Sequence, residues 1–506
     1  MDGQITQTEE EEEARQSDEY IQRLNRLEDL KSMGVEPFGE AYNRTHRIED
    51  LVKAYNQAVT EGESAVDNLP SFKIAGRIMS MRGMGKASFC NLTDVTGTLQ
   101  FYIRQDSISE MEFAAFRKLY VGDLIGIEGR LFMTKKNELT LRVSKIDILS
   151  CGIRPLPEKH KGLRDKETRY RRRYVDLIVN PEVRQTFITR SKLITSIRRT
   201  LDEKDYIEVE TPILSSIAGG AAARPFKTFH NTLKMDFFLR IATELHLKRL
   251  LVGGLEKVYE IGRIFRNEGV SQKHNPEFTT IELYEAYSDF EGMMNLCEEL
   301  ISNACRAVHG SSEVNYDEQI INFGGSWRRM RYLESIAKFG EYSMDQLQTE
   351  ESVRELCRER KIEVDLKLPL GKLYDALFEE VVEPHLFQPT FIYDYPKELS
   401  PLAKQIPDQP NMTYRFEAFV ANMEIANAFS ELNDPLDQHE RFKQQMKDRE
   451  QGDDEAHEMD MDYVEALEYG MPPAGGMGIG IDRLAMILSG NTSIREVILF
   501  PHLRNK

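Results

Sequence analysis

The sequence predicts an α+β protein in which a small five-stranded β-barrel precedes a larger domain, built on a mainly antiparallel sheet flanked by helices. Residues 71–150 alternate apolar and polar positions in short runs separated by glycine or asparagine, which is the pattern of barrel strands. From residue 205 onward, strand and helix patterns mix without the regular alternation that a parallel sheet requires. The length of 506 residues also exceeds what one hydrophobic core usually serves.

The composition indicates a reducing, aqueous compartment. The five cysteines are odd in number and never fall in a CxxC spacing, which argues against a disulfide framework and against a zinc site. The N-terminus is acidic, with glutamates at 9–13, and lacks the basic-then-apolar pattern of a signal peptide. No uncharged apolar stretch is long enough to cross a bilayer. We therefore expect a cytoplasmic protein with no membrane partner.

The pattern along the chain predicts four segments. An acidic tail and N-terminal helices, expected at about 11–31 and 48–59, lie within residues 1–68. The segments that follow are the barrel (69–152), a basic linker (153–178) and the larger domain (179–506). A polar, helical insertion is expected near 307–378 of the larger domain.

The barrel has the layout of an OB fold, because a helix at 109–119 follows the third of its five strands. Such barrels commonly bind single-stranded nucleic acid, although a barrel without any ligand gives the same pattern. Aromatic and positively charged side chains on the strands favour RNA binding. They are Arg77, Arg82, Lys86, Phe89, Phe101 and Tyr102.

Net charge does not exclude an RNA partner. The chain carries a formal charge of −18, but nucleic-acid binding responds to the local field rather than to the total. A basic run from Arg164 to Arg173 follows the barrel, and by itself it is most simply a solvated linker.

A long helix is expected to open the larger domain. Asn180 is a capping residue type, and Pro181 and Glu182 suit the first turn. The helix should run to about Lys204, with apolar residues from Val183 to Leu201 on one face.

Two polar segments of the larger domain predict a binding site. The chain contains neither of the two common nucleotide-binding loops: residues 478–483 begin like a dinucleotide motif but lack its third glycine, and no GxxxxGK[ST] run exists. In the first segment, Arg266 and Glu268 share one strand face, and Phe278, Thr280, Glu282 and Tyr284 share a face of the next strand. So many charges on one face are costly unless they meet a ligand or each other. A surface hairpin is the alternative, and the two aromatic rings count against it.

The second segment brings carboxylates together. A turn at Val420–Ala421 would place Glu417 directly opposite Glu424, and such a pair is destabilising without a cation between its members. Oxygen ligands suit Mg²⁺, so this hairpin predicts a magnesium site. Asn427, Phe429 and Glu431 alternate along the outgoing strand.

These motifs resemble those of the class II aminoacyl-tRNA synthetases. FRNE with its following loop and strand is similar to their second motif, GIGIDR before an apolar helix to their third, and the helix leading to YIEVETPIL to their first. GGAAARPF, LRIATELHLKRL, LSPLAK, FSELND and ILFP narrow the resemblance to the bacterial lysyl-tRNA synthetases, over nearly the whole chain. Three residues depart from the usual glycines: Asp205, Ala426 and Ala428.

The resemblance implies an ATP site with two catalytic arginines. Arg266 would hold the α-phosphate and the amino-acid carboxylate, and Arg483 would stack on adenine opposite Phe278. Glu268 would bind the adenine amino group, His274 the far phosphates, and Asn275 would also line this site. Glu417 and Glu424 would hold Mg²⁺ on the phosphates, and Glu417 would also take part in ATP binding.

The resemblance also implies the amino-acid and tRNA contacts. Glu244, Glu282 and the backbone near Gly220 would receive the α-ammonium of L-lysine. Glu431 and Tyr284 would receive its ε-ammonium, with Asn427 and Phe429 along the stem. In the OB domain, Phe89 would stack on an anticodon base of tRNA(Lys), and Arg77, Gln100 and Glu138 would read base edges. A homodimer is expected, with the apolar face from Val183 to Leu201 at its interface.

Three other interpretations share parts of this pattern. An aspartyl- or asparaginyl-tRNA synthetase would have the same domains, but an aspartate pocket needs a cation where this sequence offers Glu431. A catalytically inactive scaffold protein would not be expected to keep Arg266, Glu417, Glu424 and Arg483 together. An enzyme that attaches lysine to a protein would not be expected to keep an anticodon-binding domain.

Overall fold

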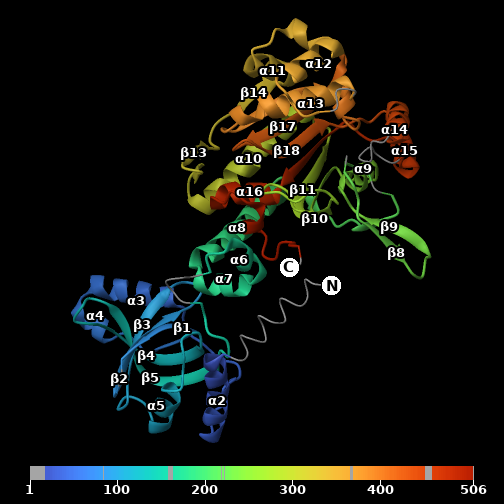
Figure 1. The fold of residues 1–506 in the computed structure, drawn as a ribbon. Coiled ribbons are helices and arrows are strands. Elements are labelled where there is room, and N and C mark those ends of the chain that lie inside the picture. The colour runs from blue at the N-terminus through green and yellow to red at the C-terminus, as the bar shows by residue number, and fades with distance from the viewer. Residues whose placement is uncertain are drawn as a thin grey trace. The chain divides into compact units, whose positions relative to one another are not determined.

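The computed structural model describes residues 17–83, 85–157, 163–217, 219–221, 223–364, 368–450 and 459–504, without the side chains of Glu63 and of residues 448–450. The chain forms two compact units: the first extends to Asp165, and the second runs from Lys166 to His502 (Figure 1). The acidic tail and the first residues of the helix expected at 11–31 lie outside the described residues.

The first unit is the predicted barrel. Its strands β1 (Phe72–Arg82), β2 (Ala87–Thr93), β3 (Thr98–Arg104), β4 (Leu124–Met133) and β5 (Leu139–Ser150) close in the order β1-β2-β3-β5-β4. Helix α5 (Glu110–Phe116) follows β3, as expected for an OB fold.

The N-terminal helices belong to the same unit as the barrel. They are α2 (Asp18–Ser32), α3 (Ile48–Glu61) and α4 (Glu63–Asp67). Leu30 and Leu51 are fully buried in the barrel's hydrophobic cluster. On α2, the buried Arg26 donates to both carboxylate oxygens of Asp123, at 2.5 and 2.8 Å, which fixes the helix by a two-pronged ion pair.

The basic linker expected over 153–178 needs correction from Lys166 onward. This part forms α6 (Lys166–Arg171) and α7 (Arg173–Val179) within the second unit. Arg173 is fully buried and pairs with buried Asp176 at 2.6 Å. Some of the charges that suggested a solvated segment are therefore buried. Burial of the guanidinium is tolerated because a carboxylate three residues away neutralises it.

The second unit is built on a nine-stranded sheet. Its main path runs β14-β15-β17-β18-β19-β11-β10-β6, with β16 beside β17. All pairs are antiparallel except β14–β15 and β10–β6, which confirms the mainly antiparallel prediction. The strands are β6 (Ile207–Glu208), β10 (Lys257–Phe265), β11 (Glu277–Ala286), β14 (Arg328–Arg331), β15 (Thr390–Pro396), β16 (Gln405–Ile406), β17 (Gln409–Val420), β18 (Met423–Ser430) and β19 (Ala474–Gly480).

Helices α8 (Pro181–Asp202), α10 (Phe290–His309) and α16 (Ile481–Ser489) pack together over this sheet, and their apolar residues form its largest core with the strands (Figure 1). Helix α8 occupies the predicted range, but its start differs from the expectation. Asn180 makes no capping hydrogen bond, because its side-chain amide donates to Asp176 instead, at 2.7 Å.

The apolar face of α8 expected at a dimer interface is partly covered. Val183, Ile197 and Leu201 are buried by the chain's own elements, whereas Phe187 and Ile194 on the same face are only half-buried. After the helix, Asp205 has a φ of 63°, in the left-handed region. This explains why glycine is usual there, and aspartate is one of the side chains that tolerates that region.

The insertion near 307–378 is less helical and less polar than expected. It begins with a β-hairpin, β12 (Glu313–Tyr316) and β13 (Gln319–Asn322), and then supplies β14 to the main sheet. Its helices are α11 (Tyr332–Gly340), α12 (Glu350–Glu359) and α13 (Leu370–Val381), with the 3-10 turn η1 (Met344–Leu347). They enclose an apolar cluster of their own, so their polar residues form only the outer face.

The remaining elements surround the sheet. A small sheet has the order β7-β9-β8, and 3-10 turns and helices connect the rest. These elements are β7 (Leu214–Ser215), β8 (Lys227–His230), β9 (Met235–Leu239), α9 (Glu244–Val252), η2 (Glu383–His385), η3 (Lys397–Leu399), α14 (Pro435–Glu450), α15 (Met461–Glu468) and α17 (Ile494–Val497). Among the described residues, no helix combines the length and the apolar character needed to span a membrane.

Candidate active site

Strict alternation along the central strands separates a core face from a polar face. Residues of the core face pack in the hydrophobic cluster; they include Ile281, Phe416, Ala428 and Met477. Their sequence neighbours form two rows across the opposite face. One row is Glu417, Asn427, Gly478 and Glu282, and the next is Arg415, Phe429, Gly476 and Tyr284.

The glycines of β19 make this polar face hollow. A side chain at Gly476 would lie 2.0 Å from Glu431 Oε1 and 2.4 Å from the Tyr284 ring, so only glycine fits there. The hollow is part of a cavity of about 2120 Å³. Nearly all the predicted catalytic-domain residues line it: Gly220, Glu244, Arg266, Glu268, His274, Asn275, Phe278, Glu282, Tyr284, Glu417, Glu424, Asn427, Phe429 and Arg483.

The hairpin that carries Glu417 and Glu424 turns one residue later than expected. Ala421 and Asn422 occupy the turn, with φ values of 53° and 58°. The ladder also shifts register after Ala418, so Glu424 pairs with Phe419 and Glu417 pairs with Asn427. The predicted directly opposed pair is therefore wrong, although both carboxylates line the same cavity.

The charge of Glu424 still acts on Glu417. Burial, and then the neighbouring Glu424 carboxylate, raise the pKa of Glu417 to about 8. Each of its oxygens accepts one hydrogen bond, from Arg415 at 2.6 Å and from the Tyr395 hydroxyl at 2.9 Å. These contacts leave lone pairs free on a partly buried carboxylate that also feels the charge of Glu424, which is an environment suited to a divalent cation.

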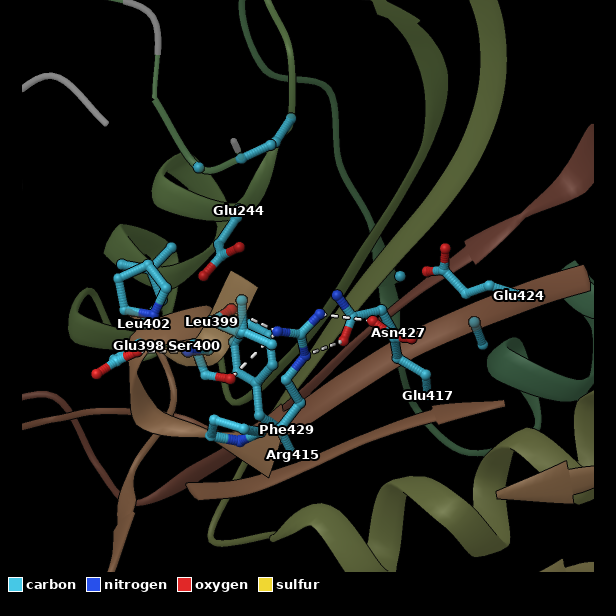
Figure 2. A pocket seen from close by; sticks show the side chains of 18 of the residues that line it. Glu244, Glu398, Leu399, Ser400, Leu402, Arg415, Glu417, Glu424, Asn427 and Phe429 are labelled. Atoms are coloured by element: carbon cyan, nitrogen blue, oxygen red, sulfur yellow. Dashed lines mark hydrogen bonds and ion pairs between the residues drawn. The ribbon is translucent and has the colours of Figure 1, made fainter. Parts of the chain in front are cut away.

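Arg415 is a central site residue that the sequence analysis missed. Its guanidinium also donates to Asn427 Oδ1 at 3.1 Å, to the Leu399 carbonyl at 2.5 Å and to Ser400 Oγ at 3.1 Å (Figure 2). Its position two residues before Glu417 places both side chains on the same strand face, and that alternation could have identified it.

The other end of the cavity carries the FRNE segment. Strand β10 ends at Phe265, so Arg266 and Glu268 lie just beyond the strand rather than within it. The Arg266 guanidinium lies 5.3 Å from the centre of the Phe278 ring, and its buried Nε has no hydrogen-bond partner among the described residues. Such an unpaired donor beside an aromatic face suits a polar ligand.

Arg483 ties together three parts of this end. It donates to the Glu424 carbonyl at 2.6 Å, lies 3.3 Å from Glu424 Oε2, and contacts His274 Nε2 at 3.1 Å. Asn275 is buried and donates to the Glu277 carbonyl at 2.6 Å, while its own carbonyl oxygen has no described partner.

The end of the cavity where the sequence predicts the amino-acid contacts is strongly acidic. Glu282 accepts a hydrogen bond from the Thr243 backbone at 3.1 Å. Burial, and then the charge of Glu244, raise the pKa of Glu282 to about 7. Gly220 has a φ of 87°, and its Cβ position would lie 3.3 Å from Glu244 Cβ, so this backbone closely approaches the start of the Glu244 side chain.

Glu431 alone among the predicted catalytic-domain residues does not line the cavity. It is buried directly beside Gly476 and Tyr284, and its carboxylate pairs with buried Lys248 of α9, a residue that the sequence analysis missed. The four-residue spacing of Glu244 and Lys248 on one helix could have revealed part of this cluster.

Comparison with known proteins decides the family. Residues 165–504 match the family of tRNA synthetases class II (D, K and N), and residues 72–149 match the OB-fold nucleic acid binding domain. The chain belongs to the class II tRNA synthetases.

Curated relatives of this class II synthetase cover almost its whole length. A lysine–tRNA ligase of Bacillus cereus is 49% identical over 97% of this chain and 98% of its own length. A lysine–tRNA ligase of Moorella thermoacetica is 51% identical over 96% of this chain and 97% of its own length. The fold and the aminoacyl-tRNA synthetase class expected from the sequence are thus confirmed.

The predicted RNA-reading residues of the OB domain lie on its strands or just before one, and they differ in exposure. Phe89 pairs with Tyr102 across β2 and β3, and the two ring centres lie 4.5 Å apart with their planes tilted by 34°. Gln100 accepts a hydrogen bond from Thr140 at 2.9 Å, which leaves its amide protons available, and Glu138 is exposed just before β5. Arg77 is partly engaged within the barrel, because one of its nitrogens donates to the Gly122 carbonyl at 2.6 Å.

Proposed function

We propose that this class II synthetase is a lysine–tRNA ligase. It activates L-lysine with ATP to lysyl-adenylate and pyrophosphate, and then transfers the lysyl group to the 3′-terminal adenosine of tRNA(Lys). The observation that carries the choice of amino acid is Glu431, a buried carboxylate beneath the glycine hollow. One of its oxygens has no hydrogen-bond or ion-pair partner among the described residues.

Lysine fits this end of the cavity because it carries a cation at each end of an apolar stem. Glu244, Glu282 and the Gly220 backbone would receive the α-ammonium. Glu431 and Tyr284 would receive the ε-ammonium. Asn427 lies in the same row of the sheet as Glu282, and Phe429 in the same row as Tyr284, and both would contact the stem. An aspartate or asparagine side chain would bring no cation to Glu431, which shares the single charge of Lys248 with Glu244, and this is costly for two buried carboxylates.

Activation requires no protein nucleophile. The lysine carboxylate attacks the α-phosphorus of ATP, and pyrophosphate leaves. Arg266 would bind the α-phosphate and the attacking carboxylate, which brings the reactants together and neutralises developing charge. His274 would contact the far phosphates and Glu268 the adenine amino group, with Asn275 nearby. Adenine would stack on Phe278, displacing Arg266 from that ring face, with Arg483 on its other side.

Glu417 and Glu424 fit a magnesium ion that arrives with ATP. The fit rests on the position of the two carboxylates, which line the same cavity; burial and the nearby Glu424 charge also raise the pKa of Glu417. Two protein carboxylates leave positions for phosphate oxygens and water, as Mg²⁺ sites at nucleotides usually do. Bound there, Mg²⁺ would withdraw negative charge from the phosphates. The role of Arg415 is to hold Glu417 and Asn427 in place.

The OB domain would recognise the anticodon of tRNA(Lys). Phe89 would provide a stacking surface for one base, backed by Tyr102. Gln100, Glu138 and the free part of the Arg77 guanidinium would contact base edges. The segment boundaries proposed for this domain, 69–152, include all four residues.

We propose a cytoplasmic homodimer. The face for a second copy lies on the elements that follow α8, because apolar side chains are exposed there in the described chain. They are Ile207, Ile213, Leu214, Phe229, Leu233 and Met235. A two-fold axis would bring the same patch from both copies together.

The experiment that tests the function is ATP–pyrophosphate exchange with each of the twenty amino acids, in the presence of Mg²⁺. Lysine should support exchange far better than any other amino acid, and the enzyme should then charge tRNA(Lys). Exchange with aspartate or asparagine, and none with lysine, would overturn the assignment.

A further inference from the structure

Lys248 is a buried cation inside the amino-acid subsite. Its side chain has 0% exposure, and its ammonium lies 2.5 Å from Glu244 Oε1. The same ammonium forms an ion pair with Glu431 Oε2. One protein lysine therefore bridges the two carboxylates that are proposed to receive the α-ammonium and the ε-ammonium of the substrate.

The surroundings leave Lys248 no other anionic partner among the described residues. Its ammonium lies 5.3 Å from the centre of the Phe429 ring and 6.0 Å from that of Tyr284, so aromatic faces enclose it. The buried Tyr463 hydroxyl of α15 has no hydrogen-bond partner among the described residues. Figure 2 shows Glu244 and Phe429 among the side chains that line the pocket.

Glu431 depends on Lys248 more than Glu244 does. Glu244 is 8% exposed and accepts a well-formed hydrogen bond from Lys248. Glu431 is 0% exposed; its Oε2 pairs with Lys248, and its Oε1 has no partner among the described residues. Desolvation of a lone carboxylate is so unfavourable that it would take up a proton rather than stay ionised.

We propose that Lys248 is a positioning residue for amino-acid selection: a built-in counter-cation that keeps Glu431 ionised and oriented toward the ε-ammonium of the substrate. This inference rests on the proposed function, and it adds a residue to it. Two carboxylates and one ammonium leave the cluster with a single uncompensated negative charge, which one substrate side-chain ammonium neutralises. Without Lys248, protons compete with the substrate for the same carboxylates.

The groups facing Glu431 act in opposite directions. Burial raises the pKa of Glu431 well above its usual range and the charges of Glu244 and Glu282 add to this rise, whereas Lys248 is the cation that opposes it. Burial alone would lower the pKa of Lys248, but Glu244 and Glu431 outweigh it, so the lysine stays protonated. Tyr284 has its pKa raised by burial and by the surrounding carboxylates, and it stays neutral.

The test is the variant Lys248→Met, which keeps most of the unbranched apolar side chain and removes its charge. At pH 7 we expect the KM for lysine in pyrophosphate exchange to rise about tenfold or more, because each unit by which the Glu431 pKa exceeds the assay pH costs a factor of ten in ionised carboxylate. The kcat and the KM for ATP should change little. The KM for lysine should recover as pH rises, whereas the native enzyme should show a flatter profile.

A buried ion pair away from the cavity provides the matched control. Arg240→Met removes the buried partner of Glu260 in the same unit, and neither residue lines the cavity. This variant should lose thermal stability without any new pH dependence of the KM for lysine. If Lys248→Met behaves like the control, or if it raises the KM for ATP equally, Lys248 is only structural and the proposal fails.

A double-mutant cycle keeps the proposal testable if Lys248→Met folds poorly. Glu431→Gln removes the carboxylate through which Lys248 acts, so Lys248→Met should fold in that background and add little to the loss of lysine affinity. Additive losses would overturn the proposal. The proposed function fails in a different way, because the native enzyme would then not activate lysine at all.

Discussion

Arg415 donates to Glu417, two residues further along β17, with 2.6 Å between Nη2 and Oε1. The same guanidinium reaches Asn427 on the neighbouring strand. A single cation thus joins a proposed magnesium ligand to a side chain of the proposed lysine site. The ATP end and the amino-acid end of the cavity therefore share one rigid support.

Removing the charge of Glu417 should separate metal binding from folding. In Glu417→Gln, we expect slower adenylate formation and a need for more Mg²⁺, because a neutral amide is a weaker ligand. The fold should persist, since the change relieves repulsion from Glu424 in the absence of metal. Pyrophosphate exchange measured against Mg²⁺ concentration checks this, and an unchanged magnesium dependence would show that Glu417 is not a ligand.

Magnesium use should also depend on pH in the native enzyme. Burial and the Glu424 charge raise the pKa of Glu417 to about 8, so a proton competes with the metal below that pH. The apparent affinity for Mg²⁺ should therefore increase as pH rises through about 8. Titrations at several pH values should show this trend, and Glu417→Gln should lose it. The same slope in both proteins would assign the titration to another group.

Glu282 should make the lysine-free enzyme less stable at high pH. Burial and the Glu244 charge raise the folded-state pKa of Glu282 from 4.5 to about 7. The folded state then holds a proton that the unfolded state has released, so stability falls as pH rises from about 4.5 to 7 and stays low above it. Glu282→Gln should remove this loss, which is of the order of 1–3 kcal/mol.

Thermal unfolding at pH 5 and pH 8 measures this effect. The variant should gain stability relative to the native enzyme mainly at the higher pH. Saturating lysine should narrow the difference, because the α-ammonium pairs with the ionised carboxylate. A gain that is equal at both pH values would indicate better packing instead of a charge effect.

Periodicity predicted the elements because the same alternation that forms a strand also buries one face of it. The barrel strands, α8 and the polar rows on β11, β17 and β18 follow directly from that rule. The resemblance to known motifs supplied Gly220, Glu244 and Arg483, which lie far apart in the sequence and on different elements. No local pattern relates them.

The contacts that depend on tertiary packing could not be predicted. The register shift after Ala418 moves Glu424 away from Glu417, and nothing in the sequence of the hairpin specifies it. The segment that carries Arg173 has the sequence of a charged linker. Its burial could not be predicted, because the sequence of one segment does not show which other parts of the chain cover it. The Lys248–Glu431 pair joins residues nearly two hundred positions apart.

The OB domain should affect tRNA charging and leave amino-acid activation intact. Phe89→Ala removes an exposed stacking surface, a loss of roughly 1–3 kcal/mol for one base contact. The KM for tRNA should rise or charging should slow, while lysine-dependent pyrophosphate exchange stays unchanged. Met111→Ala, which shortens an exposed side chain on α5, serves as the control. Equal damage to both reactions by Phe89→Ala would mean that the barrel mainly supports folding.

The exposed apolar patch should control assembly. Sedimentation should give a dimer at micromolar concentration, and Phe229→Asp together with Leu214→Asp should shift it toward monomers, because each places a charge in a closing apolar interface. Leu436→Asp, at a more exposed leucine on α14, should leave the dimer intact. A stable, active native monomer would contradict the proposed homodimer.

The choice of amino acid should depend most on Glu431. Glu431→Gln keeps the shape of the side chain and removes its charge, so lysine would meet a neutral amide where it needs an anion. Removing one partner of a buried charge pair costs about 3–5 kcal/mol, which corresponds to a loss of hundreds- to thousands-fold in kcat/KM. The KM for ATP should change little, because the ATP end of the cavity does not contact Glu431. Thermal unfolding measures separately what the loss of the buried Lys248 pair does to stability.

Neutral analogues provide the sharper comparison. Norleucine has the same stem without the ε-ammonium, so in the native enzyme it would leave Glu431 buried with an unmatched charge. In Glu431→Gln that penalty disappears, and the ratio of lysine to norleucine activation should fall steeply. Pyrophosphate exchange with both amino acids measures the ratio directly. If the variant activates lysine almost as well as the native enzyme and keeps the native ratio, Glu431 is not the carboxylate that selects lysine, and the selecting anion must be sought at Glu244 or Glu282.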